Sequence, residues 1–127
     1  MKIPDFYRLE KITKFSDVTE LLSNTRLMVP WGAVGLGMAL YDKMSEYVCN
    51  RKQFGKSLAS YQLIQKKLVE VMANVQIAIV IASQITRIHY DGGGASYGKI
   101  AFGKAVCTKV VREAAGIARE ALGGNGV

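Results

Sequence analysis

The stretch ASYQLIQKKLVEVMANVQIAIVIASQITRIHYD, residues 59–91, contains neither glycine nor proline. Its apolar residues recur every three or four positions, which is the spacing of one face of an α-helix. These residues are Ile64, Leu68, Val71, Met72, Val75, Ile79, Ala82, Ile85 and Ile88. The pattern predicts one long helix over residues 59–91.

Three glycines, residues 92–94, follow this stretch and favour a helix end, because glycine adopts left-handed backbone conformations and has low helix propensity. A second helix is predicted from about Ser96 to Leu122. Small and apolar residues lie along one side of it: Ile100, Gly103, Val106, Val110, Ala114, Ile117 and Ala121. Their small size allows a neighbouring helix to approach closely.

An earlier helix is predicted to begin at Ser16 or Asp17, because Asp17 and Glu20 have the spacing of a reciprocal capping pair. Its apolar stripe consists of Val18, Leu21, Leu22, Met28, Val34, Met38, Tyr41, Met44 and Val48. Pro30 falls inside the stripe, lacks a backbone donor and crowds the preceding turn. We therefore expect the helix to bend or restart between Met28 and Trp31.

No stretch alternates apolar and polar residues as a half-buried strand does. The sequence thus predicts an all-α protein, an antiparallel up-and-down bundle of three long helices with the fourth truncated. The third apolar face is expected to need a fourth partner.

The composition points to a single ordered domain. The 127 residues carry 17 Lys and Arg against 10 Asp and Glu, a net charge of +7, and 50% are hydrophobic, which excludes a disordered chain. Two cysteines are too few for a disulfide scaffold and suit a reducing compartment. Polar interruptions of the apolar runs, and charges in the first 15 residues, predict neither a membrane span nor a signal peptide.

The positive charge is concentrated between Arg51 and Arg112, where Glu70 and Asp91 are the only acidic residues. Such a segment can attract nucleic acid, an anionic membrane or a phosphorylated small molecule. The cations are spaced singly, with few aromatic residues between them, which is not typical of a nucleic-acid surface. No nucleic-acid partner is predicted.

The motif RKQFGKS, residues 51–57, combines cations, an amide, an aromatic ring and a glycine between two predicted helices. It is not a P-loop, which would require glycine in place of Asn50 and a preceding strand. Two interpretations stay open. Arg51 can grip a pyrophosphate with two hydrogen bonds, with Phe54 packing and Gly55 ending the helix. Alternatively, the segment is an ordinary helix C-terminus whose cations offset the helix dipole.

The last six residues are LGGNGV, residues 122–127. Their glycines can let backbone amides come close to a ligand, or they can simply end a helix.

Candidate catalytic residues are few. His89 is the single histidine, at the end of an apolar helix, and is interpreted as a surface or cap residue. Cys49 and Cys107 have no companion ligands, so no metal site is predicted.

Four motifs occur in a fixed order: NTR at 24–26, WGAVG at 31–35, RKQFGKSLASYQLIQKKL at 51–68 and AREALGGNG at 118–126. Together they resemble the C-terminal helical domain of the acyl-CoA dehydrogenase and oxidase flavoproteins. The branch is similar to glutaryl-CoA dehydrogenases and short-chain acyl-CoA oxidases. The resemblance extends from about Phe15 to Val127 and implies that residues 1–15 lead in from a missing β-domain, while residues 16–127 form an incomplete helical domain.

The resemblance also implies a four-helix bundle at the centre of a homotetramer, with FAD at the junction between subunits. Arg51 would contact the FAD pyrophosphate, with Gln53 and Phe54 beside it, and Gln62 would meet the same cofactor. The segment that approaches FAD from a different subunit would be Glu120, Ala121, Leu122, Gly123 and Gly124. The acyl-CoA site would be lined by Ser23, Asn24, Thr25 and Arg26.

In this family a glutamate removes the α-proton of an acyl-CoA thioester, and hydride passes from the β-carbon to flavin N5 to give a trans-2-enoyl-CoA. Most members carry that glutamate beyond the GGNG segment, and a minority carry it at the position of Thr25. We therefore expect no catalytic base in this chain, no activity from it alone, and weak or absent FAD binding.

The resemblance implies an electron-transfer flavoprotein as partner of a dehydrogenase, and a mitochondrial matrix location. The alternatives are a peroxisomal short-chain oxidase, or a cytoplasmic enzyme if the source is bacterial. A different class of alternative is a basic helical module that binds an acidic partner or nucleic acid. Salt-sensitive DNA binding with no response to CoA or FAD would favour that module.

Overall fold

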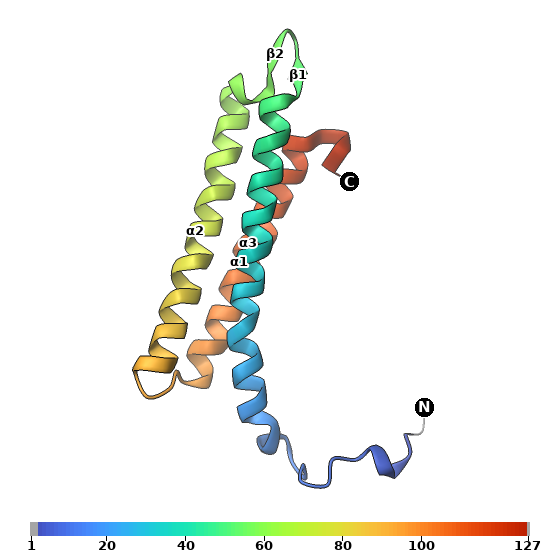
Figure 1. Ribbon diagram of the computed structural model, residues 1–127, viewed down its shortest axis with the longest axis vertical. Helices are drawn as coiled ribbons and strands as arrows, with labels where there is room; N and C mark the ends of the chain where they lie inside the picture. Colours follow the sequence, from blue (N-terminus) through green and yellow to red (C-terminus); the bar gives the residue numbers. More distant parts are fainter. Residues whose placement is uncertain (1–2, 127) are drawn as a thin grey trace.

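The computed structural model describes residues 3–126, which form three long helices side by side (Figure 1). They are α1 (Thr19–Asn50), α2 (Gln62–Asp91) and α3 (Tyr97–Leu122). Each helix packs against the other two, and α2 runs opposite to α1 and α3. The described residues also include short 3-10 turns, η1 (Asp5–Tyr7), η2 (Phe15–Val18), η3 (Leu58–Ser60) and η4 (Gly123–Gly126), and a two-stranded hairpin, β1 (Lys52–Gln53) and β2 (Lys56–Ser57). The predicted all-α, up-and-down arrangement is confirmed.

The second and third helices match their predicted bounds closely. The α2 helix begins at Gln62 rather than Ala59, because η3 precedes it and Tyr61 is extended, with φ −93° and ψ 129°. Gly93 and Gly94 have positive φ angles of 76° and 108° after the end of α2. The hydroxyl of Ser96 caps α3 by accepting from the Lys99 amide at 3.4 Å.

The first helix begins at Thr19, two to three residues after its predicted start, and its predicted capping pair is wrong. The Asp17 carboxylate accepts hydrogen bonds from the backbone amides of Thr13 and Lys14, at 2.9 and 3.0 Å, so it caps the residues that precede it. These bonds lower the pKa of Asp17. Val18 occupies the N-cap of α1 without a side-chain hydrogen bond, and the side chain of Glu20 lies outside the described part of the structure.

Pro30 does not restart the first helix. The α1 helix continues through it as one element, and the Pro30 side chain is among the most completely buried. A proline costs a helix one hydrogen bond. Burial of the apolar ring offsets part of that cost.

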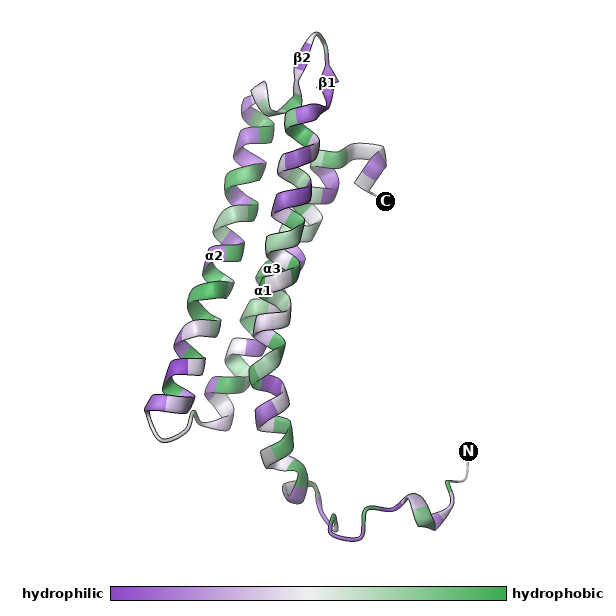
Figure 2. Cartoon of the chain, viewed as in Figure 1, coloured by the Kyte–Doolittle hydropathy of each residue, from purple (hydrophilic) through white to green (hydrophobic). Residues whose placement is uncertain are grey.

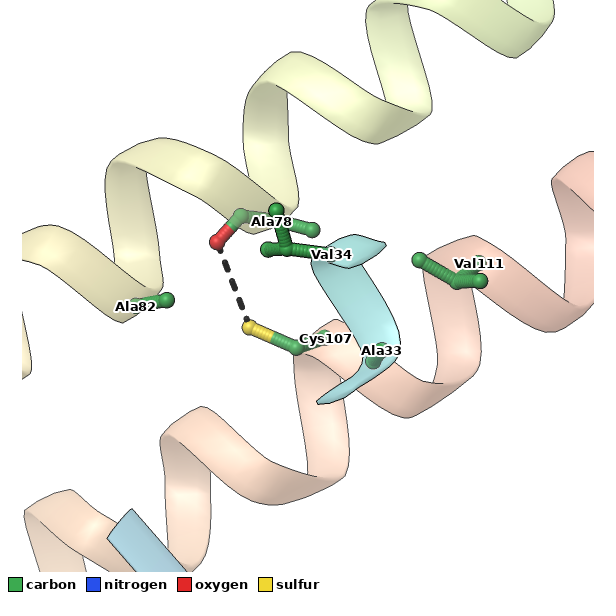
Figure 3. Close-up of a cluster of buried hydrophobic side chains, with 6 residues drawn as sticks. All are labelled: Ala33, Val34, Ala78, Ala82, Cys107 and Val111. Carbon is green, nitrogen blue, oxygen red and sulfur yellow. Dashed lines mark hydrogen bonds between the residues drawn. The ribbon is translucent and has the colours of Figure 1, made fainter. Parts of the chain in front are cut away.

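The core consists of three clusters along the bundle. The central one contains small side chains from all three helices: Ala33, Val34, Ala78, Ala82, Cys107 and Val111 (Figure 3). A second, around Met44, Val48 and Val71, lies toward the α1–α2 connection, and a third contains Leu27, Ile85 and Ile100. The small central residues let the helix backbones approach one another closely.

Large apolar side chains also remain on the outside of the bundle. Hydrophobic residues, green in Figure 2, recur along all three helices. Leu36, Val69, Val80 and Phe102 are each more than 60% exposed. By length and composition α2 is apolar enough to cross a membrane, and only 28% of its most apolar window is buried within this chain. The core helix of a helical bundle can have the same length and hydropathy as a membrane span. Here α2 packs against both α1 and α3, which favours the predicted role of a bundle helix.

The two cysteines should differ sharply in reactivity. Cys49 is exposed, whereas Cys107 is fully buried and its thiol donates to the Ala78 carbonyl at 3.5 Å (Figure 3). Burial raises the pKa of Cys107, which disfavours the reactive thiolate. In a titration with a thiol reagent, we expect one fast equivalent from the folded chain and a second only in denaturant. Cys49→Ala should remove the fast phase; two fast equivalents from the folded chain would contradict the packing around Cys107.

Candidate functional site

The connection between α1 and α2 is a small hairpin and not a helix cap. The α1 helix ends at Asn50, five residues before Gly55, so the interpretation of Gly55 as its terminator is wrong. Strand β1 (Lys52–Gln53) pairs antiparallel with β2 (Lys56–Ser57). The two turn residues, Phe54 and Gly55, both have positive φ angles, 53° and 84°, as a two-residue type I′ hairpin requires.

The hairpin base and the C-terminal glycine turn enclose a common pocket of about 440 Å³. The end of α1 and strand β1 contribute Tyr47, Arg51 and Gln53, while Leu58 and Ile64 form its apolar side. The opposite wall comes from the end of α3 and from η4: Glu120, Ala121, Leu122, Gly123, Gly124 and Asn125. Seven of the predicted cofactor residues, from two motifs far apart in sequence, therefore line one pocket within this chain.

Most cations around the pocket already have partners. The Lys67 ammonium is 2.8 Å from the Glu120 carboxylate, and this hydrogen bond and charge hold the pKa of Glu120 below its usual range. The Arg119 guanidinium donates to the Gly126 carbonyl at 2.7 Å. Arg51 is different: within residues 3–126 its guanidinium has no ion pair and no hydrogen bond. Arg51 thus supplies the uncommitted positive charge of the pocket.

Two predicted cofactor residues lie outside this pocket. Phe54 is 94% exposed at the hairpin tip, and Gln62, the exposed first residue of α2, is not among the lining residues. Arg51 and Gln62 therefore do not line this pocket together. Their joint role in binding a cofactor, enclosed by copies from associated chains, stays a prediction.

Phe54 should destabilise the hairpin that carries it. A side chain with a Cβ is strained in the left-handed region, by about 1 kcal/mol, whereas asparagine tolerates it better. The Phe54 ring is too exposed to offset this strain by packing. We expect Phe54→Asn to raise the free energy of unfolding by up to about 1 kcal/mol, measured by urea denaturation. Destabilisation by the substitution would contradict the type I′ geometry; Phe102→Asn, at an exposed helical position, is the control and should not stabilise.

The predicted acyl-CoA residues lie near the opposite end of α1. The Ser23 and Thr25 hydroxyls donate to the backbone carbonyls of Thr19 and Leu22, at 2.9 and 3.2 Å. The Arg26 guanidinium lies 4.8 Å from the ring centre of Tyr97, at the start of α3, and Asn24 is exposed. Arg26 and Asn50 are 24 residues apart on one helix, which corresponds to about 36 Å. The predicted FAD-binding residues and the predicted acyl-CoA residues of one chain therefore lie at two separate places, one at each end of α1.

Sequence reasoning missed two polar residues of the pocket as site residues, Tyr47 and Asn125. Their side chains meet across it, with the Asn125 amide donating to the Tyr47 hydroxyl at 2.9 Å. Tyr47 precedes Arg51 by four residues, the helical spacing that places side chains on one face, and this signal could have indicated it.

The fold is a helical bundle with a pocket where the α1–α2 hairpin meets the C-terminal turn. The sequence model described as "Acyl-CoA dehydrogenase, C-terminal domain" matches residues 15–127. This chain belongs to the acyl-CoA dehydrogenase family, as the resemblance predicted.

Individual relatives support the same branch. A glutaryl-CoA dehydrogenase of Desulfococcus multivorans is 29% identical over 105 residues, which are 83% of this chain and 27% of that protein. The crystal structure of glutaryl-CoA dehydrogenase from Mycobacterium smegmatis is 26% identical and superposes with a TM-score of 0.85, over 98% of this chain and 32% of that one. Butyryl-CoA dehydrogenase from Megasphaera elsdenii is 26% identical, with a TM-score of 0.81 over 88% of this chain and 29% of that one. The chain spans about a third or less of the length of these relatives.

Proposed function

We propose that this chain is the C-terminal helical part of an FAD-dependent acyl-CoA dehydrogenase and that its pocket binds the pyrophosphate of FAD. In this proposal Arg51 and residues 120–124 of one chain contact the same FAD, whereas the resemblance implies that residues 120–124 approach it from a different subunit. The observation that carries the proposal is that Arg51, whose guanidinium has no ion pair or hydrogen bond within residues 3–126, lines one pocket together with Gly123 and Gly124. A solved relative, the Mycobacterium smegmatis glutaryl-CoA dehydrogenase, is described in complex with FADH2 and is 27% identical, with a TM-score of 0.85 over 91% of this chain and 30% of that one.

The residues of the pocket fit such a group. Arginine matches pyrophosphate oxygens with two parallel hydrogen bonds. At Gly123 and Gly124, an added Cβ would meet nothing within 4 Å, so the space beside this backbone is open to a ligand. Gly123 has a φ of 58°, which turns the chain away from α3. Bound FAD would supply the two-electron acceptor for α,β-dehydrogenation of an acyl-CoA thioester.

In this proposal residues 23–26 line the acyl-CoA site. Arg26 has a fixed position beside Tyr97 and offers a positive charge to a CoA phosphate or an acyl carboxylate. Thr25, with its hydroxyl bound to a backbone carbonyl, cannot act as the proton-abstracting carboxylate. In this proposal the glutamate comes from outside residues 1–127, and the chain alone is inactive.

A homo-oligomer completes both sites. The residue sets at the two ends of α1 are about 36 Å apart, which supports a proposed arrangement in which each junction takes its FAD-binding and acyl-CoA-binding residues from different copies. The exposed apolar bands of the helices would be covered by other copies or by the remaining helix of the domain. Residues 1–15 would connect to a preceding β-domain, and an electron-transfer flavoprotein in the mitochondrial matrix would accept the electrons.

NMR titration of the full chain tests the flavin site, because chemical shifts detect weak binding. FAD and ADP, which contain a pyrophosphate, should shift the amides of Gln53, Gly123 and Gly124. Riboflavin, which lacks the pyrophosphate, should not shift them. Absence of any FAD-dependent shift at these amides, or equal shifts with riboflavin, would refute the pyrophosphate site.

A further inference from the structure

The C-terminal glycine turn, η4, is held to the bundle from two sides. On the α3 side, the Arg119 guanidinium donates to the Gly126 carbonyl at 2.7 Å. On the α1 side, the Asn125 amide donates to the Tyr47 hydroxyl at 2.9 Å. This is the one hydrogen bond recorded between η4 and α1 among residues 3–126.

The bond to Tyr47 determines the shape of the pocket more directly than the bond to Arg119. Arg119 ties the turn back to the helix from which it emerges, and so fixes only its end. Tyr47 contacts the glycine turn from a different helix, α1. Arg51 follows Tyr47 by four residues, about one helical turn. The Tyr47–Asn125 bond therefore spans the pocket and sets the separation between the glycine wall and the Arg51 side.

Tyr47 itself is well suited to a fixed anchor. Its ring is half-buried against the cluster around Met44 and Val48, which limits its rotamers. Gly123 and Gly124, in contrast, have no side chains with which to hold the turn, and glycine loses more conformational freedom on ordering than any other residue. An external tie is needed to keep these two residues in one conformation.

We infer that Tyr47 is a positioning residue that holds the glycine turn, through Asn125, in the conformation in which it lines the pocket. The inference rests on the proposed function for the identity of the ligand, but the ordering of the turn does not depend on it. Without the hydroxyl, the turn would have to be ordered when the ligand binds, at the expense of affinity.

The test compares the wild-type chain with Tyr47→Phe, Asn125→Ala and the double variant. Tyr41→Phe is the matched control, since Tyr41 is another half-buried tyrosine of α1 in the same cluster and its hydroxyl makes no hydrogen bond within residues 3–126. The 15N–{1H} heteronuclear NOE of the Gly123 and Gly124 amides reports their order on the ps–ns timescale. It should fall in both single variants, fall no further in the double variant, and stay unchanged in Tyr41→Phe.

A general structural role would lower the thermal stability of the chain without a selective loss of order at the turn. An unchanged NOE at Gly123 and Gly124 in Tyr47→Phe, or additive losses in the double variant, would overturn the inference. FAD titration is a separate arm: Tyr47→Phe should weaken binding about 2- to 10-fold, the loss of one neutral hydrogen bond. If the wild-type chain shows no FAD-dependent shifts, the proposed flavin site fails while the NOE comparison still decides the role of Tyr47.

Discussion

Arg51→Gln should weaken FAD binding to this chain by about 10- to 100-fold. Hydrogen bonds to charged groups contribute about 1.5–3 kcal/mol each, and the Arg51 guanidinium has no competing partner within residues 3–126. Glutamine keeps hydrogen-bonding capacity but loses the charge and the paired donors. The measurement is the FAD concentration that half-saturates the shifts of the Gln53 and Gly123 amides.

Lys52→Gln is the matched control for Arg51→Gln. It removes the same charge from the adjacent residue, which lies in β1 but does not line the pocket. We expect it to weaken binding by less than about 3-fold, through loss of long-range attraction alone. Equal effects of the two substitutions would show that general positive charge attracts the ligand and that Arg51 makes no specific contact.

Gly37→Leu should lower the free energy of unfolding by about 1–3 kcal/mol, the usual effect of forcing extra volume into a packed core. Gly37 is buried where α1 crosses the other two helices. A Cβ there would lie 3.0 Å from Val75 Cγ2 on α2 and 3.3 Å from Val111 Cγ2 on α3. The rest of a leucine side chain would push α1 away from both partners. Urea denaturation measures the loss as a lower midpoint.

Gly116→Ala provides the opposite case on α3. Gly116 is exposed, and an added Cβ meets nothing within 4 Å. Alanine favours the helix over glycine by about 0.5–1 kcal/mol, so this variant should be more stable than wild type. If Gly37→Leu were as stable as Gly116→Ala, the close approach of the three helices at Gly37 would be wrong.

The helices were predictable because their signals are local. The glycine-free run at residues 59–91, the three glycines after it and the small and apolar stripe over residues 96–122 predict α2 and α3 to within three residues. The start of α1 was mispredicted because the Asp17 carboxylate can accept from the amides that precede it or from those that follow it. The sequence does not show that it accepts from the preceding amides of Thr13 and Lys14. The hairpin was missed because its turn carries Phe54, and not the Asn or Asp that usually signals a type I′ turn.

The site was predictable only in part. The two motifs of the pocket, around Arg51 and around Gly123, were selected by resemblance, but spacing along the chain does not show that they share one pocket. Tyr47 and Asn125 are 78 residues apart, and a hydrogen bond over that separation depends on how α1 and α3 pack. Residue type and local periodicity carry no information about such a pair.

The 36 Å between the two ends of α1 has a genetic consequence under the proposed assembly. A dimer of two subunits damaged only at Arg51 loses both junctions, and so does a dimer of two subunits damaged only at Arg26. Combined in one dimer, they bring both lesions together at one junction and leave the other intact. Two inactive alleles of the parent enzyme would then complement each other, and the mixed dimer would have up to half of the activity of the wild-type dimer.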